Sequence, residues 1–202
     1  MDALVAELRG RSSECTEYQV NTIFIGGGTP SVVDAGRIRQ VLDTVRSCYD
    51  LQRDAEITLE MNPGTVDNGK LRTYREAGIN RLSIGLQSVW NEELAALGRI
   101  HTYEQFLDAY EQAVEAGFTN INVDIMGALP GQTVTSWRET LRKLLSLEPL
   151  PGHISAYSLI VEEGTPLCSD VDNGVVSLPD EDGEREMYLM TEAILEEAGF
   201  RR

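Results

Sequence analysis

The sequence lacks the features that mark several large functional classes. It has no apolar run of membrane-spanning length, and its N-terminus is polar rather than a signal peptide. Basic residues are few, because 17 Lys and Arg stand against 33 Asp and Glu, giving a formal charge of -16. Since phosphate binding needs clustered cations, nucleic acid and anionic membranes are disfavoured as partners. We therefore predict a cytoplasmic protein that binds small molecules.

Metal-binding residue types are also scarce. The three cysteines, Cys15, Cys48 and Cys168, are far apart and form no CxxC-type cluster, so we expect reduced thiols and no metal site. The only histidines are His101 and His153. A structural role is expected for both, although His101 follows Arg99 in a candidate ligand-binding loop.

The most distinctive local feature is the glycine triplet at residues 26–28, which follows the apolar run 22–25 and precedes Thr29 and Pro30. Glycine lets the backbone approach a ligand closely, and Pro30 restrains Thr29 to an extended conformation. No Gly-Lys-Ser/Thr follows, and the third glycine of a dinucleotide fingerprint is missing. The triplet therefore indicates either a tight strand-to-helix turn or a backbone cradle whose ligand its neighbours must identify.

Two-residue alternation of apolar and polar residues indicates strands, and apolar residues at a 3.6-residue period indicate helices, so that the sequence predicts an α/β chain. We expect strands at 21–26, 55–60, 80–86, 120–125 and 153–159, and helices at 2–9, 34–49, 67–78, 102–117, 136–148 and 180–199. Ser136 and Glu139 suggest a capping box for the fifth helix, and residues 166–179 read as a loose acidic segment. Strands separated by helices call for right-handed parallel crossovers, and five consecutive units favour a barrel or partial barrel over a doubly wound sheet.

The predicted strands are polar on one face, whereas buried parallel strands are usually apolar throughout. The alternating polar positions include Glu56, Thr58, Arg81, Ser83, Asn120, Asn122, Ser155 and Tyr157. Because unpartnered buried polar groups are costly, this face is expected to line a lumen around a large ligand. The alternative is a half-solvated sheet edge.

Polar residues at the carboxyl ends of these strands should converge at one rim, where such folds place their sites. The set comprises Gly27, Gly28, Thr29, Glu60, Gln87 and Asp124, with Arg99 from the loop after the third strand. A guanidinium can bind a carboxylate, a carboxylate and backbone carbonyls can accept from an ammonium, and an amide and a second carboxylate can bind ribose hydroxyls. This chemistry suits a zwitterion with a sugar attached.

Six motifs carry a family resemblance over nearly the whole chain. They are GGGTP at 26–30, LEMNPG at 59–64, NRLSIGLQS at 80–88, LGRIHT at 97–102, NVDIMGALPGQT at 122–133 and SAYSLIVEEGTP at 155–166. Their order and spacing resemble the radical S-adenosylmethionine (SAM) core of the oxygen-independent coproporphyrinogen III oxidases. The forms LGRIHT and SAYSLIVEEGTP are closer to its HemW-type heme-chaperone branch.

The resemblance implies a partial parallel (β/α)6-type barrel, incomplete at the N-terminus. It places the seven rim residues at SAM contacts, with Ile160 as a further candidate, and it assigns no catalytic residue and no metal ligand. The family's CxxxCxxC loop, which holds a [4Fe–4S] cluster, is expected upstream of residue 1, and the three cysteines cannot replace it by spacing. Residues 1–165 would then be the barrel core, and residues 166–202 a segment and helix leading to a missing C-terminal region.

Three functions stay open at this stage. The preferred one is a heme chaperone, and the others are porphyrinogen propionate decarboxylation and a cluster-free binding module. The implied ligands are SAM and either heme or a porphyrinogen, with an electron-donor protein as a further partner. Glu-Ala-Gly recurs at 76–78, 115–117 and 197–199, and its first two copies end a helix just before a strand. We therefore expect a fragment of a longer protein, inactive alone and binding SAM weakly.

Overall fold

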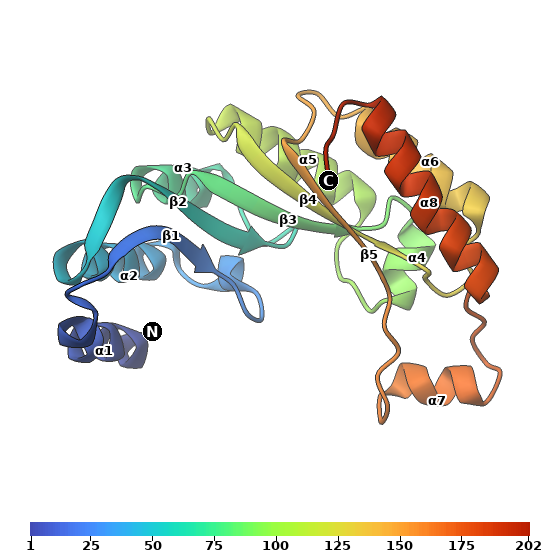
Figure 1. Ribbon diagram of the computed structural model, residues 1–202, viewed down its shortest axis with the longest axis horizontal. Coiled ribbons are helices and arrows are strands. Elements are labelled where there is room, and N and C mark those ends of the chain that lie inside the picture. Colours follow the sequence, from blue (N-terminus) through green and yellow to red (C-terminus); the bar gives the residue numbers. More distant parts are fainter. The chain divides into compact units, whose positions relative to one another are not determined.

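The computed structural model describes residues 1–202 and shows alternating helices and strands (Figure 1). The strands are β1 (Gln19–Ile25), β2 (Asp50–Met61), β3 (Arg81–Gln87), β4 (Asn120–Gly127) and β5 (His153–Ser158). The α-helices are α1 (Asp2–Arg11), α2 (Ala35–Cys48), α3 (Asn68–Glu76), α4 (Asn91–Ala96), α5 (Tyr103–Glu115), α6 (Val134–Leu145), α7 (Pro166–Asp172) and α8 (Glu181–Glu197). Two 3-10 turns, η1 (Ser12–Cys15) and η2 (Pro30–Val32), complete the order. No helix combines the length and apolar character needed to cross a bilayer.

The five strands form one sheet in the order β1-β2-β3-β4-β5. β1 pairs parallel with β2, and β2 pairs parallel with β3, so that Leu59 lies opposite both Ile25 and Leu82. Each strand neighbours the next one in sequence, which is the winding of a barrel. A doubly wound sheet would reverse its strand order at a switch point. This confirms the prediction of an α/β partial barrel.

The chain divides into two compact units. The first unit comprises residues 1–85 and 105–122, and the second comprises residues 86–104 and 123–202. In the first unit, the apolar positions of the strands form the core with helical side chains, and Leu42, Leu59, Leu71 and Leu82 are fully buried. Burial of this apolar surface is what holds α2 and α3 to the sheet, at about 25 cal/mol for each Å² removed from water.

On the other face of the first unit's strands, polar side chains bind one another. Asn122 Nδ2 donates to Ser83 Oγ at 2.7 Å, and both residues are buried. Arg81 donates to the hydroxyl of buried Thr58 at 3.3 Å. These hydrogen bonds offset the free-energy cost of burying the polar groups. The ligand-filled lumen predicted from the polar alternation remains a prediction.

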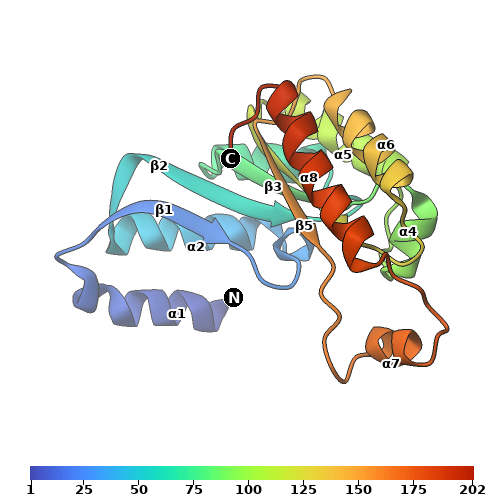
Figure 2. The same ribbon diagram turned by 45° about the vertical axis from the view of Figure 1, so that its right-hand side comes forward.

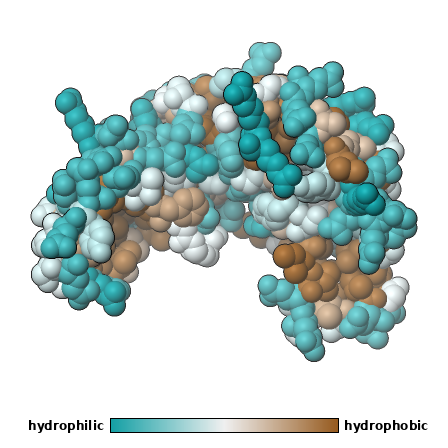
Figure 3. Space-filling model, viewed as in Figure 1, coloured by the Kyte–Doolittle hydropathy of each residue, from teal (hydrophilic) through white to brown (hydrophobic).

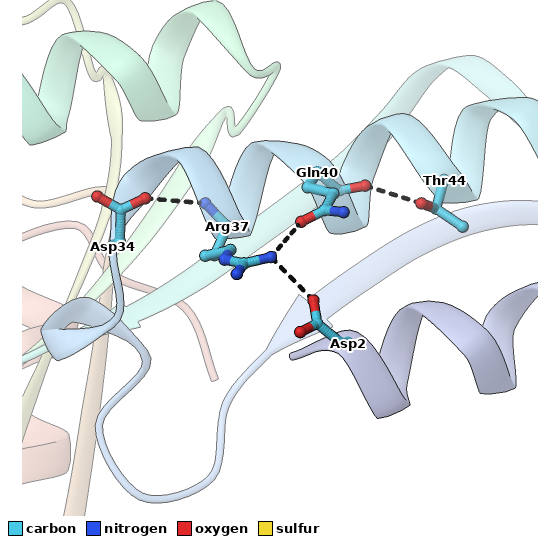
Figure 4. Close-up of polar contacts among 5 residues, drawn as sticks. All are labelled: Asp2, Asp34, Arg37, Gln40 and Thr44. Carbon is cyan, nitrogen blue, oxygen red and sulfur yellow. Dashed lines mark hydrogen bonds and ion pairs between the residues drawn. The ribbon is translucent and has the colours of Figure 1, made fainter.

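Within the first unit, the N-terminal end of helix α1 contacts helix α2. Arg37 of α2 donates to Asp2 Oδ1 at 2.8 Å and to Gln40 Oε1 at 3.0 Å (Figure 4). The N-cap residue Asp34 accepts from the Arg37 backbone N–H at 3.2 Å, as the helix start predicted from sequence requires. Thr44 Oγ1 donates back to the Gln40 carbonyl within the helix at 2.9 Å. These contacts fix the entry of α2, which follows the glycine loop.

In the second unit, α6 and α8 run side by side (Figures 1 and 2). Trp137 joins them, because its indole N–H donates to Thr191 Oγ1 at 2.8 Å while its ring lies against Gly127 at the end of β4. Apolar surface gathers around α7 (Figure 3), where Ile160 and Val175 are 79% and 73% exposed. The Gly131 N–H ties this segment to the loop after β4 by donating to the Ser177 carbonyl at 3.0 Å.

Four points of the expected secondary structure need correction. Residues 166–179 contain helix α7, for which Thr165 is the N-cap, and residues 91–96 form the short helix α4. Helix α6 begins at Val134, because Thr133 and Ser136 form the capping box, so the box predicted at Ser136 and Glu139 was placed three residues late. Strand β2 also begins five residues earlier than expected, since its polar first half pairs with the start of β1.

The Glu-Ala-Gly helix endings share one geometry. Gly78, Gly117 and Gly199 have φ values of 91°, 89° and 92°, the left-handed conformation that favours glycine. In each copy, the N–H of the residue after glycine donates to a carbonyl five residues earlier, at 3.0, 3.1 and 2.9 Å respectively. The repeat therefore specifies how each of these helices ends.

Candidate functional site

The loop at residues 26–28 of the first unit, called the glycine loop, lies against the carboxylate of Glu60. The Gly27 N–H donates to Glu60 Oε2 at 3.2 Å. A Cβ at Gly26 would lie 2.9 Å from Glu60 Cδ and 2.7 Å from Phe24 Cε1, so a side chain here would displace the ends of both residues. Gly27 and Gly28 have φ values of 86° and 63° and open space around their Cα atoms. The structure thus brings together predicted site residues from the ends of β1 and β2, with exposed backbone beside a half-buried carboxylate.

Thr29 is held by the loop after β2. Its Oγ1 accepts from Asn62 Nδ2 at 3.2 Å, and the Asn62 backbone N–H donates to Ser31 Oγ at 3.1 Å. Lys70 Nζ donates to the carbonyls of Ser31 and Thr65, at 2.8 and 3.0 Å. The sequence did not lead us to predict this support. The polar residues on both sides of Pro30 and Pro63 were the pattern that could have indicated it. The glycine loop is therefore anchored at its C-terminal end.

In the second unit, Gln87 ends β3 in an unusual turn. Its φ is 70°, and the Ser88 N–H donates to the Leu86 carbonyl at 2.9 Å, which closes a three-residue turn. The side chain is buried, and its Oε1 accepts from the Tyr157 hydroxyl of β5 at 2.9 Å. A non-glycine residue rarely adopts this φ unless its surroundings hold it there. Tyr157, predicted from sequence to lie on the face that lines the lumen, thus lies against a predicted SAM contact.

His101 also supports this turn. Its ring Nε2 lies 3.2 Å from the Leu86 carbonyl, and because a carbonyl only accepts, Nε2 carries the proton. Burial lowers the pKa of His101, with the nearby Arg99 charge acting in the same direction, while the Leu86 bond opposes both. The structural role expected for His101 is confirmed by this bond.

Arg99 and Asp124 are placed by their backbones. The Arg99 N–H donates to the Leu94 carbonyl at 2.9 Å just after Gly98, whose φ of 67° ends α4. The Arg99 side chain is half-buried. Asp124 lies within β4, also half-buried, and makes a polar interaction. Ile160, the further candidate, is 79% exposed and follows Leu159, whose N–H donates to the Gly127 carbonyl at 2.9 Å.

The residues present do not fit an iron–sulfur cluster. Cys15, Cys48 and Cys168 are free thiols, each half-buried, on separate elements. No group of three or more His, Cys, Asp or Glu side chains is placed to hold a metal ion. The cluster ligands that the resemblance implies are therefore absent from residues 1–202.

Comparisons with known proteins identify the family. The model of the radical SAM superfamily matches residues 4–144. The heme chaperone HemW of Escherichia coli is 38% identical over 202 residues, covering all of this chain and 50% of that protein. Radical S-adenosyl methionine domain-containing protein 1, mitochondrial, of Danio rerio is 39% identical over 184 residues, covering 91% of this chain and 41% of that protein. The chain thus spans about half the length of the curated relatives that it matches.

A solved structure agrees with this result over almost the entire chain. Coproporphyrinogen III oxidase (HemN) from Escherichia coli, described as a radical SAM enzyme, has a TM-score of 0.85 and 27% identity. The similarity covers 99% of this chain and 45% of that protein. The parallel sheet wound in sequence order, the glycine loop after β1 and the match over residues 4–144 agree, and the chain belongs to the radical SAM superfamily.

Proposed function

We propose that this chain is the SAM-binding part of a HemW-type heme chaperone. Identity to the HemW proteins of Escherichia coli and Lactococcus lactis is 38% and 36% over essentially the whole chain. The HemN oxidase is 27% identical over a similar span. The higher identity favours heme handling over decarboxylation of a porphyrinogen.

The glycine loop and Glu60 are the observation that carries SAM binding. Glu60 and the exposed carbonyls of the loop accept from the ligand's ammonium, while Arg99 binds its carboxylate. Gln87 and Asp124 bind the ribose hydroxyls. The missing Cβ at Gly26 supports this assignment, because a Cβ there would lie 2.9 Å from Glu60 Cδ and displace the carboxylate from the Gly27 N–H.

The chain's own contribution is binding and orientation. S-adenosylmethionine supplies a sulfonium whose reduction breaks a carbon–sulfur bond, and the protein supplies position and protection from water. The radical SAM family also uses a [4Fe–4S] cluster, but the cysteines of this chain do not fit one. We therefore assign no reaction step to these 202 residues and expect them to bind SAM without cleaving it.

Titration of the 202-residue chain with SAM, followed by amide chemical shifts, tests the binding assignment. Shifts are expected at Gly27 and Gly28, and Glu60→Gln should weaken binding at least about tenfold, as for loss of a charge-assisted bond. Glu56→Gln is the matched control, because Glu56 lies on the same face of β2 but is exposed, and it should bind as the wild type does. A wild-type chain that shows no shifts with SAM contradicts the proposal.

Heme handling is tested separately on the full gene product. Heme titration followed by visible absorbance should give saturable binding, and coproporphyrinogen III should release no CO2. Decarboxylation without heme binding would replace the chaperone by an oxidase. The predicted cytoplasmic location and electron-donor partner remain predictions, since the relatives include bacterial HemW proteins and proteins named mitochondrial.

A further inference from the structure

A buried carboxylate stands behind the Gln87 turn. Glu93, on the short helix α4, is 8% exposed, and no positive charge pairs with it. Its Oε2 accepts from the Ser88 hydroxyl at 2.5 Å and from Gln132 Nε2 at 3.0 Å. Ser88 and Gln132 are themselves buried. Hydrogen bonds to a carboxylate are stronger than neutral ones, which is how an unpaired buried charge can be retained.

These bonds form one continuous chain between two loops. The Trp90 N–H donates to Ser88 Oγ at 3.0 Å, and the Ser88 hydroxyl in turn donates to Glu93. On the other side, Gln132 uses its amide N–H on Glu93 and accepts with Oε1 from the Leu129 N–H at 3.3 Å. Glu93 thus joins the loop after β3 to the loop after β4, both in the second unit.

Each of these loops begins with a strained residue. Gln87 and Ala128 are the two non-glycine residues with positive φ, at 70° and 58°. They lie one residue before Ser88, whose hydroxyl donates to Glu93, and Leu129, whose N–H donates to Gln132. Such conformations are strained and persist only when their surroundings hold them. The Glu93 network supplies that restraint at both turns.

We propose that Glu93 is a positioning residue that holds the Gln87 turn, and so aims the Gln87 side chain at bound SAM. This inference rests on the proposed function. Glu93 does not touch the ligand in this scheme, because both of its donors belong to the supporting loops. Its carboxylate fixes Ser88, and Ser88 fixes the backbone on which Gln87 turns.

The test compares four forms of the 202-residue chain: wild type, Glu93→Gln, Glu92→Gln and the double variant Glu93→Gln with Gln132→Glu. In Glu93→Gln, the amide of residue 93 faces the amide of Gln132, and the charge-assisted hydrogen bonds from Ser88 and Gln132 to the carboxylate are lost. Binding of SAM is expected to weaken at least about fivefold. This is less than the full effect of losing a hydrogen bond to a charged group, because Glu93 acts on the ligand only through the Gln87 turn. Exposed Glu92 is the control and should leave affinity unchanged. The double variant exchanges amide and carboxylate within the same pair and should recover most of the affinity.

Amide hydrogen exchange supplies a second readout that needs no ligand. Exchange at the Ser88 N–H, which closes the Gln87 turn, is expected to accelerate in Glu93→Gln and to return toward the wild-type rate in the double variant. If the wild type binds SAM and Glu93→Gln binds it equally well, the inference is wrong and the proposed function stands. If the wild type binds no SAM, the proposed function fails, and faster Ser88 exchange still supports Glu93 as the residue that holds the turn, whereas unchanged exchange overturns it.

Discussion

The loop after β1 and the turn after β3 present their candidate ligand groups in opposite ways. The first uses glycine, so that bare backbone reaches the surface beside one half-buried carboxylate, Glu60. The second uses a glutamine in a conformation that glycine would adopt more easily, and buried hydrogen bonds hold it there. The comparison teaches that a backbone cradle needs empty space, whereas an aimed side chain needs a rigid support.

The largest effect is expected where empty space is filled. Gly26→Ala places a methyl group 2.9 Å from Glu60 Cδ, so the carboxylate must move away from the Gly27 N–H. We expect SAM affinity to fall at least about tenfold, while thermal stability changes little because both displaced groups are side-chain ends. Gly10→Ala is the control, since a Cβ there meets no atom within 4 Å and Gly10 lies in helix α1, outside the glycine loop, so that affinity should stay unchanged. Equal affinities in the two variants would contradict the carboxylate's role.

The second effect concerns the rigid turn. Gln87→Val puts a β-branched side chain at a φ of 70° and removes the bond from Tyr157, so the free energy of unfolding should fall by about 2 kcal/mol. Gln87→Asn, which tolerates this region better, should lose about 1 kcal/mol or less. Urea unfolding followed by circular dichroism measures both values. A Val variant as stable as the Asn variant would mean that the turn is not strained.

A smaller effect is expected just beyond the glycine loop. Asp34→Ala removes the side-chain cap of α2 and should cost about 1 kcal/mol of unfolding free energy. Because the cap contacts the helix and not the glycine loop, SAM affinity should stay at the wild-type value. Arg37→Ala is the comparison at the same helix end, and it should cost no more than about 0.5 kcal/mol, since its ion pair with Asp2 is largely exposed. Loss of SAM binding in Asp34→Ala would show that the loop depends on the helix behind it.

The last prediction is a slope with pH. Burial lowers the pKa of folded His101, so between the folded pKa and the unfolded value near 6.5 the unfolded chain binds more protons. The contribution of His101 to stability is therefore fully present above about pH 6.5 and is lost as the pH falls. Comparing pH-dependent unfolding of wild type and His101→Gln isolates this slope. A wild-type curve with the same slope as the variant would contradict the neutral, bonded imidazole.

Local pattern was enough to predict most of the fold. The 3.6-residue stripe around Leu42 and the alternation around Leu59 correspond to a helix and a strand, because apolar spacing decides which face is buried. The capping box of α6 was misplaced, since Thr133 and Ser136 can form the same reciprocal bonds as the pair chosen from sequence. Helix α7 was missed because none of its residues is buried and its pattern carries no apolar stripe.

The supporting residues of the site could not be read from the sequence. Glu93 looks like any acidic residue in the first turn of a helix, and its burial depends on Ser88 and Gln132, which lie five residues before it and 39 residues after it. Similarly, the bond from Tyr157 to Gln87 spans 70 residues. Sequence spacing identifies the groups that face a ligand, whereas the groups that hold them in place become visible only when distant segments meet.

The shared ending of three helices has a consequence for how this chain tolerates change. At Gly78, Gly117 and Gly199 the same left-handed residue and the same backward hydrogen bond end the helix. After the first two, the next residues, Ile79 and Phe118, are fully enclosed and lead directly into β3 and β4. A residue inserted earlier in such a helix is therefore expected to be accommodated by a bulge or extra turn within that helix. The glycine ending still fixes where the helix stops, so the following strand enters the sheet with the same side chains facing the core.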